Sequence, residues 1–240
     1  MLPQNASQPL NAGTFTPAQV AAEQAAFMRK VYAIMAFGLG ATGLTALVVF
    51  NSRAATQFIF GTPGVYLGLI IAELVMVFTF ASLARRMSAV GAAALFYIYA
   101  ILNGLTLSVV FLIYTKGSIA STFFVTAGTF GAMSAYGYVT KRDLTGVGSF
   151  MMMGLFGLII ASIVNLFMRS EMIYWLTTYA GILIFVGLTA YDTQKIKQLN
   201  VIGNAGTDED HKEAIHGALI LYLDFVNLFL YLLRLLGRRR

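Results

Sequence analysis

Two aspartates in apolar surroundings are the residues of this sequence best suited to chemistry. Asp192 ends one apolar run, and Asp224 lies inside the next apolar run along the chain. An ionisable group within a bilayer is costly and usually marks a functional pathway. Two close carboxylates in a low dielectric cannot both ionise easily, so they titrate as a pair. Such a pair is suited to sensing protons, and its oxygens are candidate ligands for a hard cation such as Ca²⁺.

A purely structural role for these acids stays open at this point. Each aspartate would then cap a helix end or pair with a nearby base such as Lys195. Glu73 is a third acid in apolar sequence, and it is either a protonated carboxyl that hydrogen-bonds to a neighbouring helix or part of an ion path. The acidic stretch Asp208–Glu213 lacks the spacing and the glycine of an EF-hand loop, so we interpret it as a solvated connector.

The composition predicts that these acids are held by membrane-spanning helices. The chain has 240 residues, of which 58% are hydrophobic and 11% charged, and its mean hydropathy is +0.77. A soluble domain is about 25% charged, and continuous apolar runs of about 20 residues favour helices over a barrel. Cysteine is absent, which excludes disulfides and thiolate chemistry. The net charge of +6 comes from bases that flank apolar runs, which indicates membrane orientation rather than nucleic-acid binding.

Seven apolar segments are predicted to span the membrane: Val31–Phe50, Val65–Leu83, Ala89–Ile113, Ile119–Val139, Val147–Met168, Ile173–Tyr191 and Ala218–Leu236. Residues 1–28 form a polar N-terminal tail with a helix start, and residues 29–240 form one transmembrane domain. Thr16 is the expected N-cap of the first helix, with Pro17 at the first helical position and Gln19 at the third. The last of the four prolines is at position 63, so none lies in a span and any helix break has to come from glycine.

Small and polar residues within the spans predict how the helices pack. We expect close approach of helices at the small-residue pairs Gly64/Gly68, Gly128/Gly131 and Gly154/Gly157. Interhelical hydrogen bonds are expected from Asn103, Asn165 and Asn227, and a position at the membrane interface from Tyr191, Tyr222 and Tyr231.

The basic residues predict the orientation of the chain. On the side of the N-terminus lie Arg29, Lys30, Arg85, Arg86, Lys141, Arg142, Lys195, Lys197 and Lys212, whereas Arg53, Lys116 and Arg169 lie on the other side. This bias predicts a cytoplasmic N-terminus. The arginines at the C-terminal end depart from the rule if the last segment crosses fully. We expect a full crossing, because that segment is long enough and contains no glycine or proline at which to turn.

Three stretches of the sequence resemble one family of membrane proteins. Residues 187–196, Gly-Leu-Thr-Ala-Tyr-Asp-Thr-Gln-Lys-Ile, look like the signature of the Bax inhibitor-1 family. Residues 103–108 in the third span and 221–229 in the seventh resemble the same family, and the resemblance covers roughly residues 29–237. It implies a seven-helix bundle with the seventh helix central. It also implies a pH-sensitive calcium leak in which Asp192 and Asp224 form the proton sensor.

The resemblance further implicates a second-span acid in the pore and a later base in its latch. Glu73 matches the acid, and we assign the base to Arg85, although Arg86 lies equally close to the expected spacing. Calcium is expected as the permeant or bound ion, with no cofactor. The expected partners are the lipid bilayer and other membrane proteins, not nucleic acid. The polar start lacks the pattern of a signal peptide, and together with the composition this indicates a bacterial inner-membrane protein.

Enzymatic activity is not expected. Intramembrane aspartyl proteases carry their second acid in a Gly-x-Gly-Asp context with a later Pro-Ala-Leu, whereas here Leu221-Tyr222-Leu223 precedes the second acid and no proline follows position 63. No histidine lies in a predicted span, which disfavours a rhomboid-like serine mechanism. The alternative that stays open is a non-transporting membrane interaction protein that modulates a stress response or a membrane-bound protease.

Overall fold

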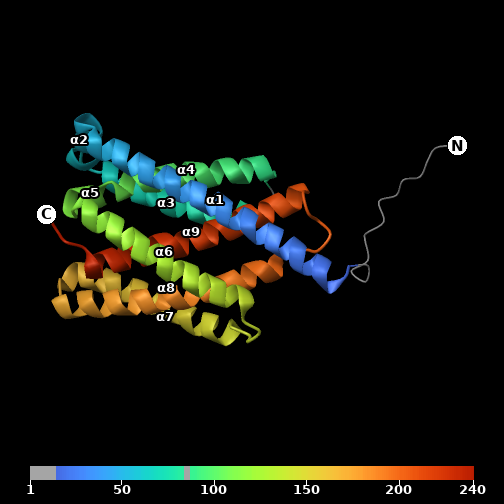
Figure 1. Cartoon of the computed structure of the whole chain (residues 1–240). Helices are drawn as coiled ribbons and strands as arrows, with labels where there is room; N and C mark the ends of the chain where they lie inside the picture. Colours follow the sequence, from blue (N-terminus) through green and yellow to red (C-terminus); the bar gives the residue numbers. More distant parts are fainter. Residues whose placement is uncertain (1–14, 84–86) are drawn as a thin grey trace.

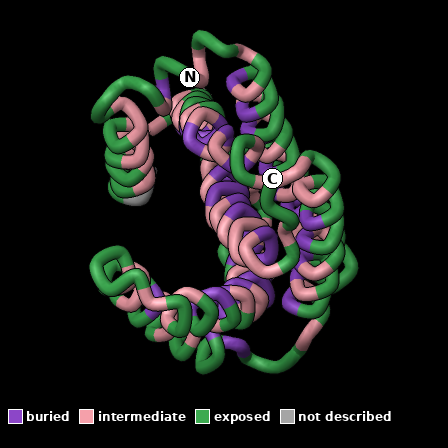
Figure 2. Tube along the Cα trace, turned by 90° about the vertical axis from the view of Figure 1, so that its left-hand side faces the viewer, coloured by how far each residue is buried: buried purple, intermediate pink, exposed green. Residues whose placement is uncertain are grey.

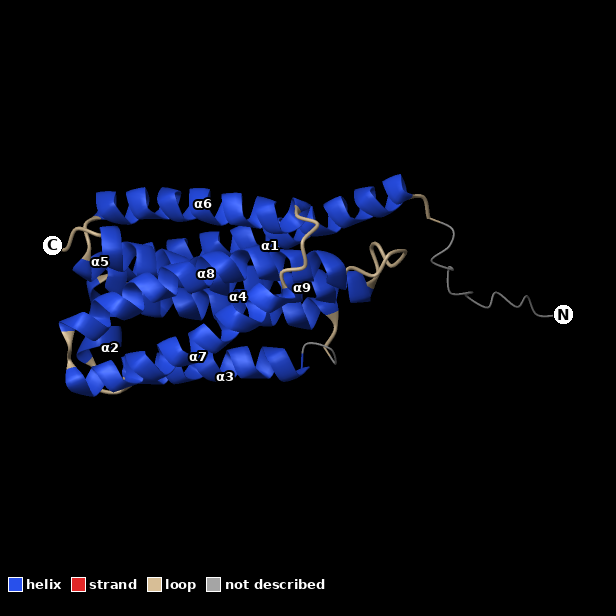
Figure 3. Ribbon diagram, turned by 90° about the horizontal axis from the view of Figure 1, so that it is seen from below, coloured by secondary structure: helices blue, strands red, loops and turns tan. Residues whose placement is uncertain are grey.

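The computed structural model describes residues 15–83 and 87–240. The described residues form helices and loops without a strand (Figure 3). The helices are α1 (Pro17–Asn51), α2 (Arg53–Gly61), α3 (Val65–Leu83), α4 (Ala89–Leu107), α5 (Val109–Ile113), α6 (Lys116–Val139), α7 (Thr145–Met168), α8 (Glu171–Leu199) and α9 (Asp208–Leu236). The long helices lie side by side, and the chain ends at the opposite end of the bundle from the start of α1 (Figure 1).

Five of the described helical stretches are long and apolar enough to cross a membrane, so the chain is an integral membrane protein. They are α1, α4 with α5, α7, α8 and α9. A sixth span results if α2 and Val65–Phe80 of α3, which meet at an angle of 82°, count as one broken span. The prediction of seven spans is therefore not confirmed. The helix α6 falls short because its serines, threonines and glycines lower its hydropathy.

The start of α1 agrees with its sequence signal. The Thr16 hydroxyl accepts a hydrogen bond from the Gln19 N–H at 3.3 Å, and the Gln19 side chain accepts one from the Thr16 N–H at 2.8 Å. Pro17 occupies the first turn, where no N–H is needed. This capping box confirms the predicted helix start.

The last two helices are longer than their predicted spans. The helix α8 continues to Leu199, and α9 begins at Asp208 rather than near Ala218. The interpretation of residues 208–213 as a solvated connector is therefore wrong. Thr207 caps α9 by accepting a hydrogen bond from the Asp210 N–H at 3.2 Å, and acids in the first turn meet the positive end of the helix dipole.

The predicted third span is broken at Ser108, between α4 and α5. The Ser108 hydroxyl donates a hydrogen bond to the Leu105 carbonyl at 2.6 Å, and the Thr106 hydroxyl donates one to the Asn103 carbonyl at 2.9 Å. Hydroxyl groups that bond to nearby carbonyls compete with the helix ladder and bend it. The sequence analysis predicted that any helix break has to come from glycine. This prediction is wrong here, because serine and threonine hydroxyls bond to the carbonyls at the break.

The closest helix contacts occur at other glycines than those predicted. A Cβ placed on Gly104 of α4 would lie 2.6 Å from the Thr42 carbonyl oxygen of α1, so only glycine allows this approach. Of the predicted pairs, Gly154 alone has a described neighbour from another helix, Ile184 at 3.1 Å. Apart from chain neighbours and the backbone of the same helix, no described atom lies within 4 Å of such a Cβ at Gly64, Gly68, Gly128, Gly131 or Gly157. The prediction is wrong for these five glycines.

The helix α9 packs against α1, α4, α6 and α8, and buried residues gather on the inward faces of the bundle (Figure 2). Within the described residues, α3 packs on α2 and α4, whereas α7 packs on α8. The bundle is consequently open on one side, between α3 and α7 (Figure 2). A cleft of about 690 Å³ lies there, and residues of α3, α4, α7, α8 and α9 line it.

Candidate functional site

The side chains of Asp192 on α8 and Asp224 on α9 meet. The two helices pack against each other, and the two carboxyl groups lie close enough to interact electrostatically. Asp224 is only 5% exposed. A hydrogen bond between two carboxyl groups requires a proton on one of them, because an ionised carboxylate can only accept. The geometry therefore fits a pair that holds one proton in common.

Neither aspartate serves as a helix cap or as a member of an ion pair among the described residues. Both lie inside their helices, and the described ion pairs involve only Lys30 and Lys212 as bases. Lys195, one turn after Asp192, attracts it electrostatically, but its ammonium lies over the Tyr191 ring, 5.5 Å from the ring centroid. The Oδ2 atom of Asp224 is buried and has no hydrogen-bond partner in the described part of the chain.

Both carboxyl groups line the cleft between α3 and α7. On α9 the lining residues recur every three or four positions, which places them on one face of the helix: Ile220, Leu223, Asp224, Asn227 and Tyr231. On α8 they are Phe185, Leu188 and Asp192. The facing walls are apolar and include Leu74 and Phe78 of α3. The acid pair is therefore the one charged feature of the described lining, in a setting that strengthens its electrostatics.

Glu73 lies apart from the acid pair, in a polar network between helices. Its carboxylate accepts hydrogen bonds from the Thr106 hydroxyl at 2.6 Å and from the Asn103 amide at 3.4 Å, both on α4. The Tyr222 hydroxyl of α9 donates to the Asn103 Oδ1 at 3.1 Å and lies 2.7 Å from the Thr42 hydroxyl of α1. Glu73 is thus a carboxyl bonded to a neighbouring helix, and the network joins α3, α4, α9 and α1.

Tyr222 is the buried residue that sequence reasoning missed. It was expected at the membrane interface, but its exposure is 0%, and its ring packs edge-on against Phe96 at 5.7 Å and Tyr99 at 5.9 Å. The sequence does carry a signal for this burial, because a residue two positions before Asp224 points to nearly the opposite face of the helix. If Asp224 faces α8, Tyr222 has to face the helices on the other side.

The three asparagines behave differently from one another. Asn103 forms the expected interhelical hydrogen bonds. Asn227 instead donates to the Leu223 carbonyl of its own helix at 2.8 Å, and Asn165 accepts from the Ser170 N–H at 2.8 Å in the turn that follows α7. Helix ends and helix interiors offer local partners, which these two amides use.

Comparison with known proteins identifies the family. A family model described as "Inhibitor of apoptosis-promoting Bax1" matches residues 24–240. The chain belongs to the Bax inhibitor-1 family. The resemblance seen around Asp192 is thereby confirmed. The inner membrane protein YbhL of Escherichia coli (strain K12) is 49% identical over 215 residues, which cover 89% of this chain and 92% of YbhL.

Two further relatives of this chain carry names that state no activity. An uncharacterized protein of Rickettsia prowazekii, RP147, is 48% identical over 215 residues, with 89% of this chain and 90% of the relative covered. An uncharacterized protein of Borreliella burgdorferi is 43% identical over 214 residues, which cover 89% of this chain and 92% of that relative.

Two further expectations from the Bax inhibitor-1 family bear on the site. Arg85, the expected latch base, lies outside the described residues. Within the described residues, no cluster of three or more histidine, cysteine, aspartate or glutamate side chains is arranged to hold a metal ion. The candidate calcium ligands therefore amount to Asp192 and Asp224, which is fewer oxygens than a tight calcium site uses.

Proposed function

We propose that this protein is a pH-sensitive calcium leak channel, gated by the pair Asp192 and Asp224. The observation that carries the proposal is the proximity of two carboxyl groups, that of the buried Asp224 and that of the half-buried Asp192, on the wall of an otherwise uncharged cleft. Adding or removing the shared proton changes the charge of the cleft wall by one unit. In a low dielectric, such a change is large enough to bias two arrangements of the helices around it.

The channel is proposed to be a bundle of seven crossings with α9 at its centre and a cytoplasmic N-terminus. The packing of α9 against α1, α4, α6 and α8 supports the central position. The excess of basic residues on the side of the N-terminus supports the orientation. The name of the relative YbhL, an inner membrane protein, supports the bacterial inner membrane as the location.

Calcium is proposed as the permeant ion rather than as a resident cofactor. A bound Ca²⁺ takes six to eight oxygen ligands, and an ion that is to pass has to bind weakly enough to leave. Two carboxylates supplemented by water suit weak and transient binding. No covalent step is involved, so the proposed activity is not enzymatic.

Glu73 and Arg85 are proposed to act in the pore and its latch. For Arg85 the basis is the family resemblance alone: an ion pair with Asp192 holds one state shut, and protonation of the acid pair weakens it. For Glu73 the hydrogen bonds to Thr106 and Asn103 provide a mechanical basis, because they tie α3 to the network that reaches α9.

The test is calcium flux into liposomes that contain the purified protein, measured from about pH 5 to about pH 8. Asp192→Asn and Asp224→Asn are each expected to abolish the pH dependence of the flux, because the amide cannot share a proton. The matched control is Asp143→Asn in the loop between α6 and α7. Hydrogen bonds from the Thr145 hydroxyl and N–H hold the pKa of Asp143 below its ordinary value, so this carboxylate stays ionised over the whole range and its loss leaves the profile unchanged.

The same experiment separates the leak from the competing function. A non-transporting interaction protein that modulates a stress response or a membrane-bound protease is favoured by the unpartnered walls of α3 and α7, which offer room for a partner's helix. Folded protein that passes no calcium at any pH would rule out the channel and leave this second function. Flux that keeps its pH dependence in both aspartate variants would rule out the paired gate.

A further inference from the structure

A second cavity lies at the end of the bundle where the chain ends. Its volume is about 430 Å³, and it is bounded by the turn between α7 and α8, the first turns of α8 and the end of α9. Three arginines line it, Arg169, Arg234 and Arg239, against a single acid, Glu171. We call this the arginine cavity.

Two of the three guanidinium groups of the arginine cavity are held in place by aromatic side chains. Arg234 lies over the ring of Tyr174 at 4.9 Å and over that of Tyr231 at 5.3 Å. Arg239 donates a hydrogen bond to the Tyr174 hydroxyl at 3.0 Å. Because planar guanidinium groups fixed in this way lose little freedom on binding, they are prepared to form paired hydrogen bonds to a phosphate.

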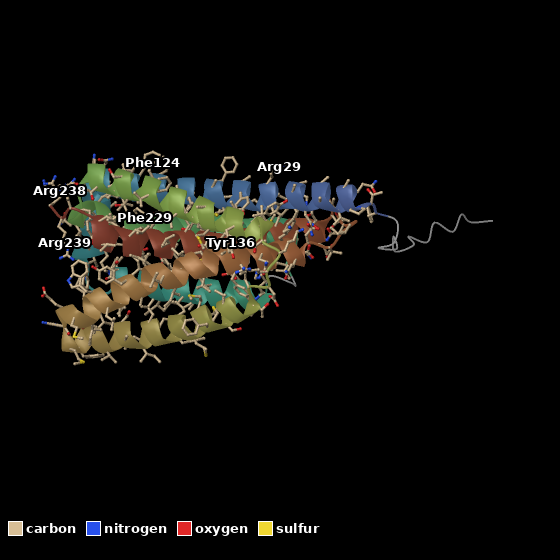
Figure 4. The ribbon with its side chains drawn as sticks, turned by 60° about the horizontal axis from the view of Figure 1, so that its bottom comes forward. Arg29, Phe124, Tyr136, Phe229, Arg238 and Arg239 are labelled. Atoms are coloured by element: carbon tan, nitrogen blue, oxygen red, sulfur yellow. The ribbon has the colours of Figure 1, made fainter. Side chains whose placement is uncertain are left out.

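The C-terminal tail is fixed by its backbone, which sets the position of Arg239. The Thr115 N–H donates to the Arg238 carbonyl at 3.1 Å, and the Arg240 N–H donates to the Ile113 carbonyl at 2.9 Å. The tail therefore lies along the junction of α5 and α6. Figure 4 shows Arg238 and Arg239 together at this end of the bundle, far from Arg29 at the other end.

The positive charge of the arginine cavity is not balanced by the described residues. The described ion pairs use Lys30 and Lys212 as their bases, so none includes an arginine of this cavity. Two of these arginines, Arg234 and Arg239, also break the charge bias that orients the rest of the chain. A cluster of unbalanced arginines in a cavity attracts an anion.

The surface beside the cavity is suited to lipid. Phe167 at the end of α7 is 83% exposed, and Met172 and Leu176 on α8 are 79% and 64% exposed. Trp175 lines the cavity and stacks on Tyr179, with ring centroids 6.1 Å apart. Tryptophan and tyrosine favour the headgroup level of a bilayer. The arginines thus lie where headgroups are, next to apolar side chains that acyl chains can cover.

We propose that the arginine cavity binds the phosphate headgroup of an anionic phospholipid, with the acyl chains along the exposed face of the first turns of α8. A phosphate diester whose headgroup carries no cation supplies the net negative charge that the three arginines attract, and the tails supply the apolar contact that a soluble anion cannot make. This site is separate from the paired-aspartate cleft and does not depend on calcium transport.

The test uses the full chain purified in a zwitterionic detergent, with lipid binding measured by native mass spectrometry. Phosphatidylglycerol is compared with phosphatidylcholine of the same acyl chains. The variant R234Q/R239Q is expected to bind phosphatidylglycerol about 25-fold more weakly, from about fivefold for each arginine removed. The matched control is Arg238→Gln, which removes a neighbouring exposed arginine that does not line the cavity and leaves binding unchanged.

A second variant keeps the test decisive if the double variant fails to fold. Arg169→Asn removes the third guanidinium, and asparagine tolerates the left-handed backbone of this residue, φ 51°. It is expected to weaken phosphatidylglycerol binding about fivefold. Equal binding of the two lipids, or an equal loss in Arg238→Gln, would overturn the proposal. Displacement of the lipid by soluble glycerophosphate at similar concentrations would also overturn it, because the cavity would then be a site for a free phosphate.

Discussion

The hydroxyl group of Tyr222 on α9 connects polar side chains of two other helices in the apolar interior. It donates to Asn103 on α4 and lies against Thr42 on α1. Tyr222→Phe leaves the Asn103 oxygen buried without this donor, which is expected to lower the free energy of unfolding by about 1–3 kcal/mol. The measurement is the thermal unfolding midpoint in detergent. Tyr179→Phe, at a residue that is 53% exposed, is the control and should leave the midpoint in place; equal midpoints for all three proteins would show that the network adds no stability.

At the scale of single residues, the sequence indicates which groups are costly but not always what they meet. Asp192 and Asp224 stand out because each is a charge in apolar sequence, and antiparallel neighbours bring them to similar depth. Their contact follows from that argument. Asn103 and Asn227 are both uncharged polar residues in apolar sequence. Asn103 bonds to other helices, whereas Asn227 bonds to the backbone of its own helix. The hydropathy of a residue does not indicate in which direction its side chain points. The hydrogen-bond partners of the uncharged polar residues are therefore not predictable from it.

The packing of α1 on α4 depends on Gly104, and this gives a prediction at the scale of helices. A Cβ at this position would lie 2.6 Å from the Thr42 carbonyl and 2.7 Å from the Thr45 Cβ, so Gly104→Ala has to push the two helices apart. The expected loss is about 1–3 kcal/mol of unfolding free energy. Gly128→Ala on α6 is the control, because no described atom lies within 4 Å and alanine favours a helix. Chemical unfolding of both variants checks this; a greater loss in Gly128→Ala would contradict the assigned contact.

Helix ends were predictable where a capping signal stood beside an apolar run. Thr16, Pro17 and Gln19 mark the start of α1 correctly. The start of α9 carries a comparable signal, Thr207 followed by acids, but Thr207 lies eleven residues before the apolar run begins at Ala218. Hydropathy locates the part of a helix that lies in the membrane, and α9 extends beyond that part. Charged residues before a span therefore have to be tested for caps before they are assigned to a loop.

At the scale of the whole molecule, the apolar runs predict helices but not which of them meet. The open side between α3 and α7 follows from α3 packing on α4 and α7 packing on α8, and no periodicity in the sequence distinguishes these pairings. Except in α9, hydropathy is spread evenly around the circumference of the long helices, so it does not mark one face as inner and another as outer. The cleft, and with it the exposure of the acid pair, could only come from the three-dimensional structure.

The direction of α9 determines on which side of the membrane the chain ends. This helix runs unbroken for 29 residues, about 43 Å at 1.5 Å per residue, which exceeds the apolar core of a bilayer. Its two ends should therefore face opposite sides. The chain has no cysteine, so Val201→Cys in the loop before α9 and Arg238→Cys after it each carry a single exposed thiol. In right-side-out membrane vesicles, a membrane-impermeant maleimide is expected to label the Arg238→Cys thiol and to reach the Val201→Cys thiol only after the vesicles are opened.

The opposite pattern, with Val201→Cys labelled in sealed vesicles and Arg238→Cys protected, would reverse the proposed orientation while keeping the crossing. Labelling of both thiols from one side would show instead that α9 does not cross, and seven crossings would then be wrong. Only a full crossing places the C-terminal arginines on the side away from the other basic residues. This outcome therefore also decides whether the arginine cavity breaks the charge bias, which is one of the reasons to expect an anionic lipid there.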